Sequence, residues 1–303
     1  MTTTVRSKVT THTLARLRER GEKAVFVTAY DYPTAVFADR AGVDLLLVGD
    51  SAAMTMMGLP GTIGITMDDM SVFVRSVCRA NPRAFVVGDL PFLSYQVSNE
   101  EAIRNAGRFV TLGCDAVKCE GGARVAGRVR AMVDAGICVM GHLGLTPQNL
   151  SQLGGYRVQG KSRAAVDRLI DDALALQDAG AFAVLLEAVP PEAAAQVRER
   201  LDLIVYGIGA GPHVDGQLVI SHDLLGNFVG EISPRFVKRM ANVGADVERA
   251  FGEYAREVRA GTFPAPEHCY SSVPPAPSRV HRNNAPHDRD VCGNSTGIPV
   301  SSG

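Results

Sequence analysis

Hydrophobic residues fall into eight short runs along most of the chain, and each run is followed by a loop and a longer amphipathic stretch. The runs begin at Ala24, Asp44, Ala84, Asp115, Ile137, Phe182, Leu203 and Gln217. Near-continuous apolar runs of this length are typical of strands buried on both faces, as in a parallel sheet. The pattern therefore predicts strands that alternate with helices.

The stretches between the runs carry helix signals. Residues 162–180, "SRAAVDRLIDDALALQDAG", place these apolar side chains on one helical face: Val166, Leu169, Ile170, Ala173 and Leu174. Gly180 is a suitable stop for this helix. Ser98 followed three residues later by Glu101 has the spacing of a capping box and predicts the start of another helix.

Eight strand–helix units in one chain predict an α/β fold, a single-domain (β/α)8 TIM barrel. The alternative is a doubly wound open sheet. The first run is not followed by the G-x-G-x-x-G of that fold, and the Gly-rich "GIGAG" comes only after the seventh run. The barrel is therefore the favoured fold.

The predicted barrel domain covers residues 24–264. Residues 1–23 are predicted to form an N-terminal helical segment, because Leu14 and Leu17 lie among charged residues. From residue 265 onward the chain is rich in Pro, Ser, Asn and Gly and has no apolar period. Residues 265–303 are therefore predicted to be a mostly disordered tail.

Composition narrows the possible partners and location. The net charge is −1, with acidic and basic residues interleaved, which argues against a nucleic-acid partner. No apolar run reaches the roughly 18 residues that cross a bilayer, and the first residues lack the apolar core of a signal peptide. The six cysteines include no C-x-x-C pair and are interpreted as reduced thiols. We expect a cytoplasmic protein with no membrane partner.

Ionisable residues stand where five successive predicted strands end. They are Asp50, Asp89, Lys118, Glu120, His142 and Glu187. A single polar residue at a strand end is ordinary, but the carboxyl ends of barrel strands all meet at the active face. Four carboxylates gathered there would repel one another, and a divalent cation is the simplest relief. Oxygen donors favour a hard metal, magnesium first.

The ordered motifs "VGDS", "GDLPF", "GHLGLTPQ", "GGYRVQG", "LLEAVP" and "PRFVK" resemble those of the ketopantoate hydroxymethyltransferase family. This family belongs to the phosphoenolpyruvate mutase and isocitrate lyase superfamily. The resemblance covers roughly residues 9–270. It implies a magnesium-dependent (β/α)8 barrel that forms a homo-oligomer, in bacteria often a decamer.

The resemblance also implies an activity and a role for each residue at the rim. The family transfers a hydroxymethyl group from 5,10-methylenetetrahydrofolate to 3-methyl-2-oxobutanoate, giving the 2-dehydropantoate of pantothenate biosynthesis. Asp50, Asp89 and Glu120 would be the magnesium carboxylates, and Glu187 the general base. The set that would hold the 2-oxo acid is Asp50, Ser51, Asp89, Lys118 and His142.

One segment departs from the family pattern. Residues 58–66 read "GLPGTIGIT", in which Leu59 and Pro60 replace a polar pair and Gly64 replaces a proline. Three alternatives follow: a paralogue that hydroxymethylates a different 2-oxo acid in secondary metabolism, a superfamily C–C lyase, or a non-catalytic barrel. The identity of the 2-oxo acid, the donor and the oligomer size stay open at this point.

Overall fold

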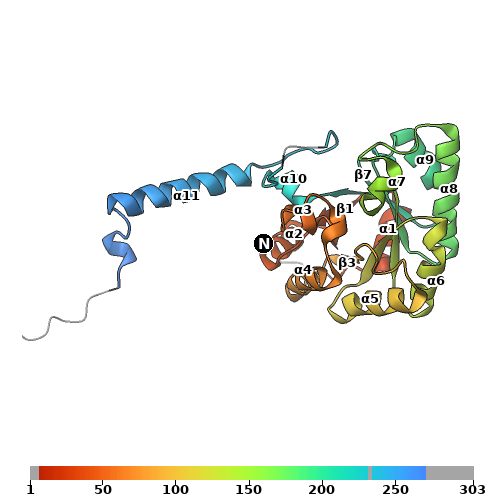
Figure 1. Ribbon diagram of the computed structural model, residues 1–303, viewed down its shortest axis with the longest axis horizontal. Coiled ribbons are helices and arrows are strands. Elements are labelled where there is room, and N and C mark those ends of the chain that lie inside the picture. Colours follow the sequence, from red (N-terminus) through yellow and green to blue (C-terminus); the bar gives the residue numbers. More distant parts are fainter. Residues whose placement is uncertain (1–6, 231–233, 271–303) are drawn as a thin grey trace, which may run out of the picture. The chain divides into compact units, whose positions relative to one another are not determined.

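The strands form a closed, parallel, eight-stranded barrel in the computed structural model, which describes residues 7–230 and 234–270 (Figure 1). The strands are β1 (Ala24–Thr28), β2 (Leu45–Val48), β3 (Phe85–Asp89), β4 (Ala116–Glu120), β5 (Val139–Gly144), β6 (Ala183–Glu187), β7 (Ile204–Ile208) and β8 (Gly216–Val219). They pair in chain order, and β8 closes on β1 with Val27 opposite Val219. The prediction of a (β/α)8 barrel is confirmed.

Helices follow most of the strands. The α-helices are α1 (Thr11–Glu19), α2 (Tyr32–Ala41), α3 (Ala52–Thr55), α4 (Met67–Arg79), α5 (Asn99–Thr111), α6 (Ala126–Asp134), α7 (Leu150–Leu153), α8 (Arg163–Asp178), α9 (Pro191–Glu199), α10 (Ser221–Leu225) and α11 (Val243–Ala260). The 3-10 helices are η1 (Thr62–Gly64), η2 (Ala123–Val125), η3 (Pro147–Asn149) and η4 (Pro266–His268). Figure 1 shows helices α2, α4, α5, α6, α8 and α9 outside the strands.

The local helix signals are largely confirmed. Helix α8 buries four of the five predicted residues, whereas Leu174 is only half-buried and Leu176 takes its place in the core. Gly180 follows the end of α8 at φ +91°, a left-handed conformation that glycine adopts without strain. Ser98 caps α5, and its hydroxyl accepts a hydrogen bond from the Glu101 amide at 3.1 Å. The eighth apolar run is strand only as far as Val219, because its second half forms α10.

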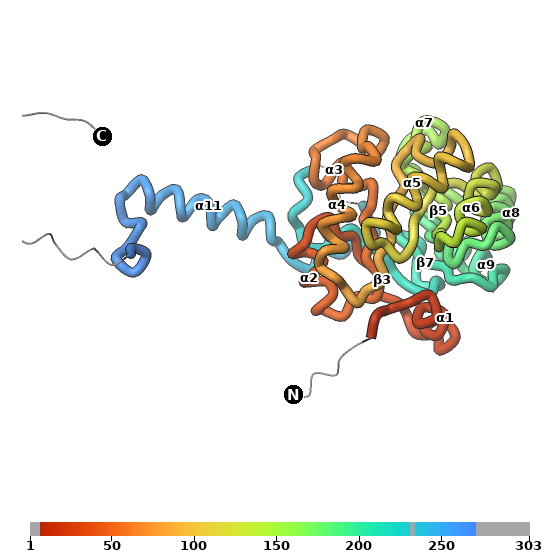
Figure 2. Tube along the Cα trace, turned by 90° about the horizontal axis from the view of Figure 1, so that it is seen from below, coloured from red at the N-terminus to blue at the C-terminus, as the bar shows by residue number. Residues whose placement is uncertain are grey.

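Alternate residues of each strand face two different cores. In β2, Leu45 and Leu47 belong to the core inside the barrel, whereas Leu46 and Val48 face the surrounding helices. Leu14 of α1 packs against the inner core, so this helix covers one end of the barrel. Figure 2 shows α1 at that end and, at the opposite end, α3 and α7, which follow β2 and β5. The carboxyl ends of the strands therefore point away from α1.

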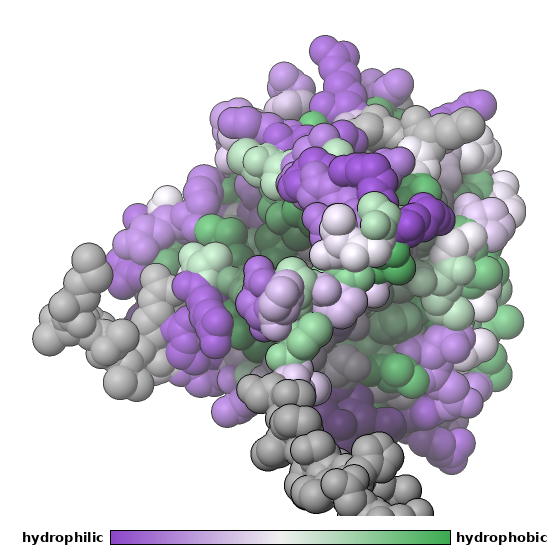
Figure 3. Space-filling model, turned by 90° about the vertical axis from the view of Figure 1, so that its left-hand side faces the viewer, coloured by the Kyte–Doolittle hydropathy of each residue, from purple (hydrophilic) through white to green (hydrophobic). Residues whose placement is uncertain are grey.

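The remaining predictions about the chain stand as follows. The boundaries of the predicted N-terminal segment, residues 1–23, and of the predicted barrel domain, residues 24–264, stay predictions. Residues 1–6, and residues 271–303 of the predicted tail, lie outside the described residues. No helix in the described part of the chain is both long and apolar enough to span a membrane. Hydrophobic residues are set between hydrophilic ones on the face in Figure 3. The five described cysteines are free thiols, and a cytoplasmic location stays a prediction.

Candidate active site

The inner side chains at the carboxyl ends of β3, β4, β5 and β6 are ionisable, and they meet at one end of the barrel. Asp89 faces the same side of β3 as Val87, and Glu187 faces the same side of β6 as Leu185. Val87 and Leu185 both belong to the inner core. Lys118, Glu120 and His142 follow the same rule in β4 and β5. Asp89 pairs in register with Lys118, and Glu120 pairs with His142. Because side chains alternate along each strand, the last inner-facing residues of these strands form a layer of ionisable groups next to the apolar inner core.

Lys118 lies at the centre of this layer and is buried. Its Nζ atom is 2.8 Å from Asp89 Oδ1, 3.7 Å from Glu120 Oε1 and 3.2 Å from His142 Nδ1. His142 Nδ1 is also 3.2 Å from Glu120 Oε1. A buried ammonium is tolerated only with such partners, since removing it from water alone would cost several kcal/mol.

The buried cluster carries more negative than positive charge. Burial raises the pKa of Asp50, Asp89 and Glu120, although the nearby Lys118 ammonium opposes the shift in each case. Burial by itself lowers the pKa of Lys118, but the three carboxylates outweigh it and raise that pKa above its ordinary value. Burial and the same ammonium lower the pKa of His142, so its ring stays neutral near pH 7. With the carboxylates ionised, two negative charges are left without a cationic partner.

The donor set fits a divalent cation. Asp89 Oδ1 and Glu120 Oε1 both face the Lys118 ammonium, at 2.8 and 3.7 Å, and this single positive charge cannot balance three buried carboxylates. In the part of the chain that the structure describes, no three His, Cys, Asp or Glu side chains converge as a complete metal cage. Magnesium needs no such cage, because it is usually held by one or two carboxylates and keeps waters and substrate oxygens.

Glu187 lies across the cluster from Asp89 and is its most accessible carboxylate. Its side chain is 17% exposed, against 1% or less for Asp89 and Glu120, and its Oε2 atom is 3.2 Å from His142 Nε2. The next residue, Ala188, has φ +49°, which is uncommon outside glycine. At Gly144, in the neighbouring strand, any Cβ atom would collide with the Glu187 carbonyl oxygen. The backbone conformation of these residues therefore fixes the position of Glu187 at the open side of the cluster.

Asp50 and Ser51 come from the turn after β2 and point to different neighbours. The Asp50 amide donates to Asp89 Oδ2 at 3.0 Å, which joins this turn to the cluster. The Ser51 hydroxyl instead lies 2.8 Å from the Tyr30 hydroxyl, within hydrogen-bond distance. The structure therefore brings together all the predicted site residues except the Ser51 hydroxyl, which has Tyr30 as its partner.

Sequence reasoning missed two buried polar residues that touch the cluster. Gln148, in η3, donates from its side chain to Asp50 Oδ2 and from its backbone to Glu120 Oε2. The Tyr95 hydroxyl donates to Gln148 Oε1 at 2.9 Å. The only sequence signal for Gln148 is its place at the end of "GHLGLTPQ", because a glutamine in a loop obeys no strand or helix period.

The unusual segment 58–66 lies beside this site without contributing a charged group to it. Its helix η1 contacts η3, the helix that carries Gln148. Thr62 is buried, and its hydroxyl has no hydrogen-bond partner. Changes in this segment therefore act on the wall of the site and leave its carboxylates in place.

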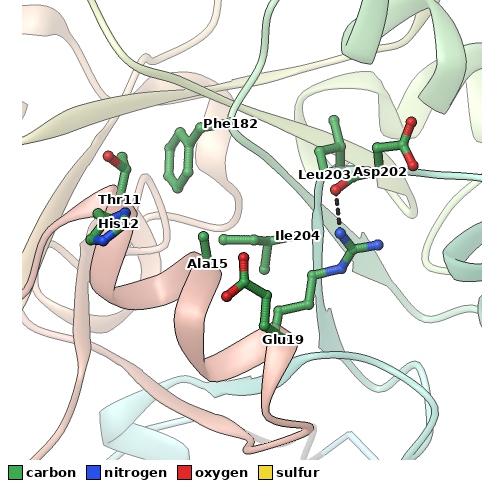
Figure 4. A pocket seen from close by; sticks show the side chains of 9 residues that line it. Thr11, His12, Ala15, Glu19, Phe182, Asp202, Leu203 and Ile204 are labelled. Atoms are coloured by element: carbon green, nitrogen blue, oxygen red, sulfur yellow. Dashed lines mark hydrogen bonds between the residues drawn. The ribbon is translucent and has the colours of Figure 1, made fainter.

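A pocket at the other end of the barrel is separate from this site. It has a volume of about 420 Å³ and lies between α1 and the start of β7 (Figure 4). Arg18 donates to the backbone carbonyls of Leu201 and Asp202 there and pairs with Asp215. These contacts already use the polar groups of Arg18, so the pocket is explained by the packing of α1.

Comparison with known proteins agrees with the geometry. A family model described as ketopantoate hydroxymethyltransferase matches residues 8–266. A 3-methyl-2-oxobutanoate hydroxymethyltransferase from Moorella thermoacetica is 52% identical over 266 residues, which are 88% of this chain and 98% of that protein. One from Pyrobaculum islandicum is 50% identical over 244 residues, 80% of this chain and 93% of that protein.

Solved structures with a similar fold are far more distant in sequence. A phosphoenolpyruvate phosphomutase from Streptomyces platensis subsp. rosaceus gives a TM-score of 0.58 at 17% identity, covering 83% of this chain and 88% of that chain. A 2,3-dimethylmalate lyase of the PEP mutase/isocitrate lyase superfamily gives 0.55 at 21% identity, with the same coverage. At these identities the likeness concerns the fold alone.

Proposed function

Because the chain belongs to the ketopantoate hydroxymethyltransferase family, we propose that it transfers a hydroxymethyl group from 5,10-methylenetetrahydrofolate to 3-methyl-2-oxobutanoate, giving 2-dehydropantoate. The observation that carries the proposal is the buried layer of Asp89, Lys118, Glu120 and His142 with Glu187 at its open side. Hydroxymethyltransferases that are 50–52% identical over most of this chain support the same activity. The chain is a hydroxymethyltransferase, and its donor and mechanism are the proposed part.

The residues suit a magnesium ion held by Asp50 and Asp89, with Glu120 reaching the ion or its waters. When bound, the ion supplies Lewis-acid polarisation of the 2-oxo acid, worth several kcal/mol. Lys118 and His142 lie between the carboxylates and would bind the oxygens of the same acid, together with the Ser51 hydroxyl. Buried hydrogen-bond donors such as the Lys118 ammonium stabilise negative charge that develops on the substrate.

Glu187 is the proposed general base. Its carboxylate removes the proton from C3 of the 2-oxo acid, and the electron pair of the C–H bond moves into the C2–C3 bond and onto the oxo oxygen. C3 then forms a bond to the methylene carbon of the donor, and water supplies the hydroxyl oxygen on that carbon. Both C–N bonds of the methylene break, and the two folate nitrogens take up the proton from Glu187 and one proton from the water, so tetrahydrofolate is released. A positioned base contributes about 10²–10⁴-fold to such a proton transfer.

An assay with a panel of 2-oxo acids tests the proposal. Purified protein is incubated with magnesium, 5,10-methylenetetrahydrofolate and each acid, and the products are identified by mass spectrometry. We expect 3-methyl-2-oxobutanoate to be converted fastest, with 2-dehydropantoate as the product and no product without the donor.

Two other results would replace the proposal. Turnover of a different 2-oxo acid, with none of 3-methyl-2-oxobutanoate, would favour the paralogue that the altered segment 58–66 suggests. Cleavage of an acid in the absence of donor would favour a superfamily C–C lyase.

The chain is also proposed to form a homo-oligomer, as its family does, with a decamer as one possible size. Helix α11 supports this, because none of its residues is buried. Its apolar side chains recur at intervals of four, three and four residues and form one exposed stripe: Val247, Phe251, Tyr254 and Val258. A second copy of the chain can cover such a stripe.

Light scattering should give a multiple of the 32.2 kDa chain mass, and a particle of that mass alone would contradict the proposal.

A further inference from the structure

Gln148 is buried among the carboxylates although it carries no charge. It lies in η3, in the loop after β5, and its side chain is within hydrogen-bond distance of two other loops, those after β2 and β3. Its Nε2 atom is 2.9 Å from Asp50 Oδ2 and 2.9 Å from the Leu90 carbonyl oxygen. Its backbone amide donates to Glu120 Oε2 at 3.0 Å. One residue thus touches the ends of β2, β3 and β4.

The amide of Gln148 can face only one way. Its NH2 group points at the Asp50 carboxylate and the Leu90 carbonyl, both of which accept hydrogen bonds and have no proton to give. Its Oε1 atom lies 2.9 Å from the Tyr95 hydroxyl, which can donate. Turning the amide over would set oxygen against oxygen on two sides, so the chemistry of its neighbours fixes its orientation.

Tyr95 contacts both Gln148 and Glu120 through its hydroxyl. Its hydroxyl oxygen accepts a hydrogen bond from the Glu120 amide at 2.9 Å, while its ring is fully buried. The phenol therefore links the backbone of one carboxylate, Glu120, to the side chain that orients another, Asp50. Buried networks in which every member is paired are rigid, because breaking one bond leaves an unpaired polar group.

We propose that Gln148 is the positioning residue for the metal carboxylates, and this rests on the proposed magnesium-dependent function. By donating to Asp50 Oδ2 and Glu120 Oε2, it fixes the rotamers of two carboxylates that come from different strands. The other oxygen of each carboxylate is not bonded to Gln148. Asp50 Oδ1 is then available to a cation, and Glu120 Oε1 faces Lys118 and His142, from where it can reach the waters of that cation. Hydrogen-bond partners of this kind are worth about 10–100-fold in metal affinity.

The structure also explains why the altered segment 58–66 matters to this residue. Helix η1 of that segment contacts η3, so its packing bears on the backbone position of Gln148. A change there can reach the metal carboxylates through Gln148 while none of the carboxylates is itself replaced.

Calorimetric titration of the metal-free protein with Mg²⁺ tests the proposal without any turnover. Gln148→Met keeps the length of the side chain and removes its donors. We expect its dissociation constant for Mg²⁺ to rise about 10–100-fold. Tyr95→Phe keeps the Gln148 amide and removes the hydroxyl that contacts both this amide and the Glu120 backbone. We expect a rise of at least about fivefold, the value of one neutral hydrogen bond. Gln152→Leu is the matched control, because Gln152 is bonded to the exposed Arg124 and touches none of the carboxylates.

A purely structural role for Gln148 predicts a different result. Gln148→Met would then lower the melting temperature, and the folded fraction would still bind Mg²⁺ within twofold of the wild-type affinity; that outcome overturns the proposal. If Gln148→Met does not fold, Tyr95→Phe decides in the same way. A wild-type protein that binds no Mg²⁺ would overturn both the positioning role and the magnesium-dependent function, whereas tight wild-type binding with unchanged variants overturns the positioning role alone.

Discussion

Replacing Glu187 with glutamine is expected to slow proton exchange at C3 of 3-methyl-2-oxobutanoate by about 10²–10⁴-fold, the contribution of a positioned base. Glutamine keeps the size of the side chain and an oxygen that can still accept a hydrogen bond from His142, but its amide cannot take up a proton at neutral pH. Exchange can be followed by NMR in deuterated water with magnesium and without any folate. The experiment therefore isolates the first chemical step from the transfer that follows.

Two controls make the result specific to Glu187. Glu192→Gln makes the same change at an exposed glutamate of α9, and it should exchange at the wild-type rate. Magnesium affinity of Glu187→Gln should stay near that of the wild type, because the proposed metal carboxylates are Asp50, Asp89 and Glu120. Exchange by Glu187→Gln at the wild-type rate would show that another group is the base.

Removing either proposed metal carboxylate is expected to weaken magnesium binding more than about 100-fold. This exceeds the 10–100-fold that a hydrogen-bond partner of a ligand is worth, because a direct ligand is lost. The variants are Asp50→Asn and Asp89→Asn, which keep the shape of the side chain and remove its charge. Titration calorimetry with Mg²⁺ measures the affinity, and circular dichroism checks that each variant is folded.

A buried aspartate at the other end of the barrel is the matched control. Asp215 pairs with Arg198 at 2.8 Å and with Arg18 at 3.5 Å, and it is as deeply buried as the metal carboxylates. Asp215→Asn should destabilise the fold, because it leaves two half-buried arginines without a counter-charge. Its magnesium affinity should nevertheless stay within twofold of the wild type. If Asp50→Asn and Asp89→Asn also kept that affinity, the assignment of the metal carboxylates would be wrong.

Much of the candidate site could be predicted because strand alternation is a local rule. Lys118 and Glu120 are two residues apart in β4, so they had to share a face of the strand. The same rule places Asp89 and His142 on the inner face of their strands. Once parallel strands were expected from the apolar runs, these groups were also expected at a common rim. In the structure each of them lies within 3.7 Å of at least one other.

The contacts of loop residues could not be predicted in this way. Gln148 and Asp50 are 98 residues apart in the chain, and both lie in segments without a strand or helix period. Their hydrogen bond depends on how the loops after β2 and β5 pack once the barrel has closed. The substrate contact of Ser51 stays a prediction, but its hydroxyl also lies 2.8 Å from that of Tyr30, a neighbour from the loop after β1 that no local pattern indicates.

The sequence by itself determined the barrel, the rim and the charges of the groups on that rim. It could do so because apolar periodicity and strand parity depend on residues within a few positions of each other. Only the tertiary structure decided which oxygens of those carboxylates are held by neighbours and which are left for a cation. That choice depends on Gln148 and Tyr95, whose loops are brought together by closure of the whole barrel.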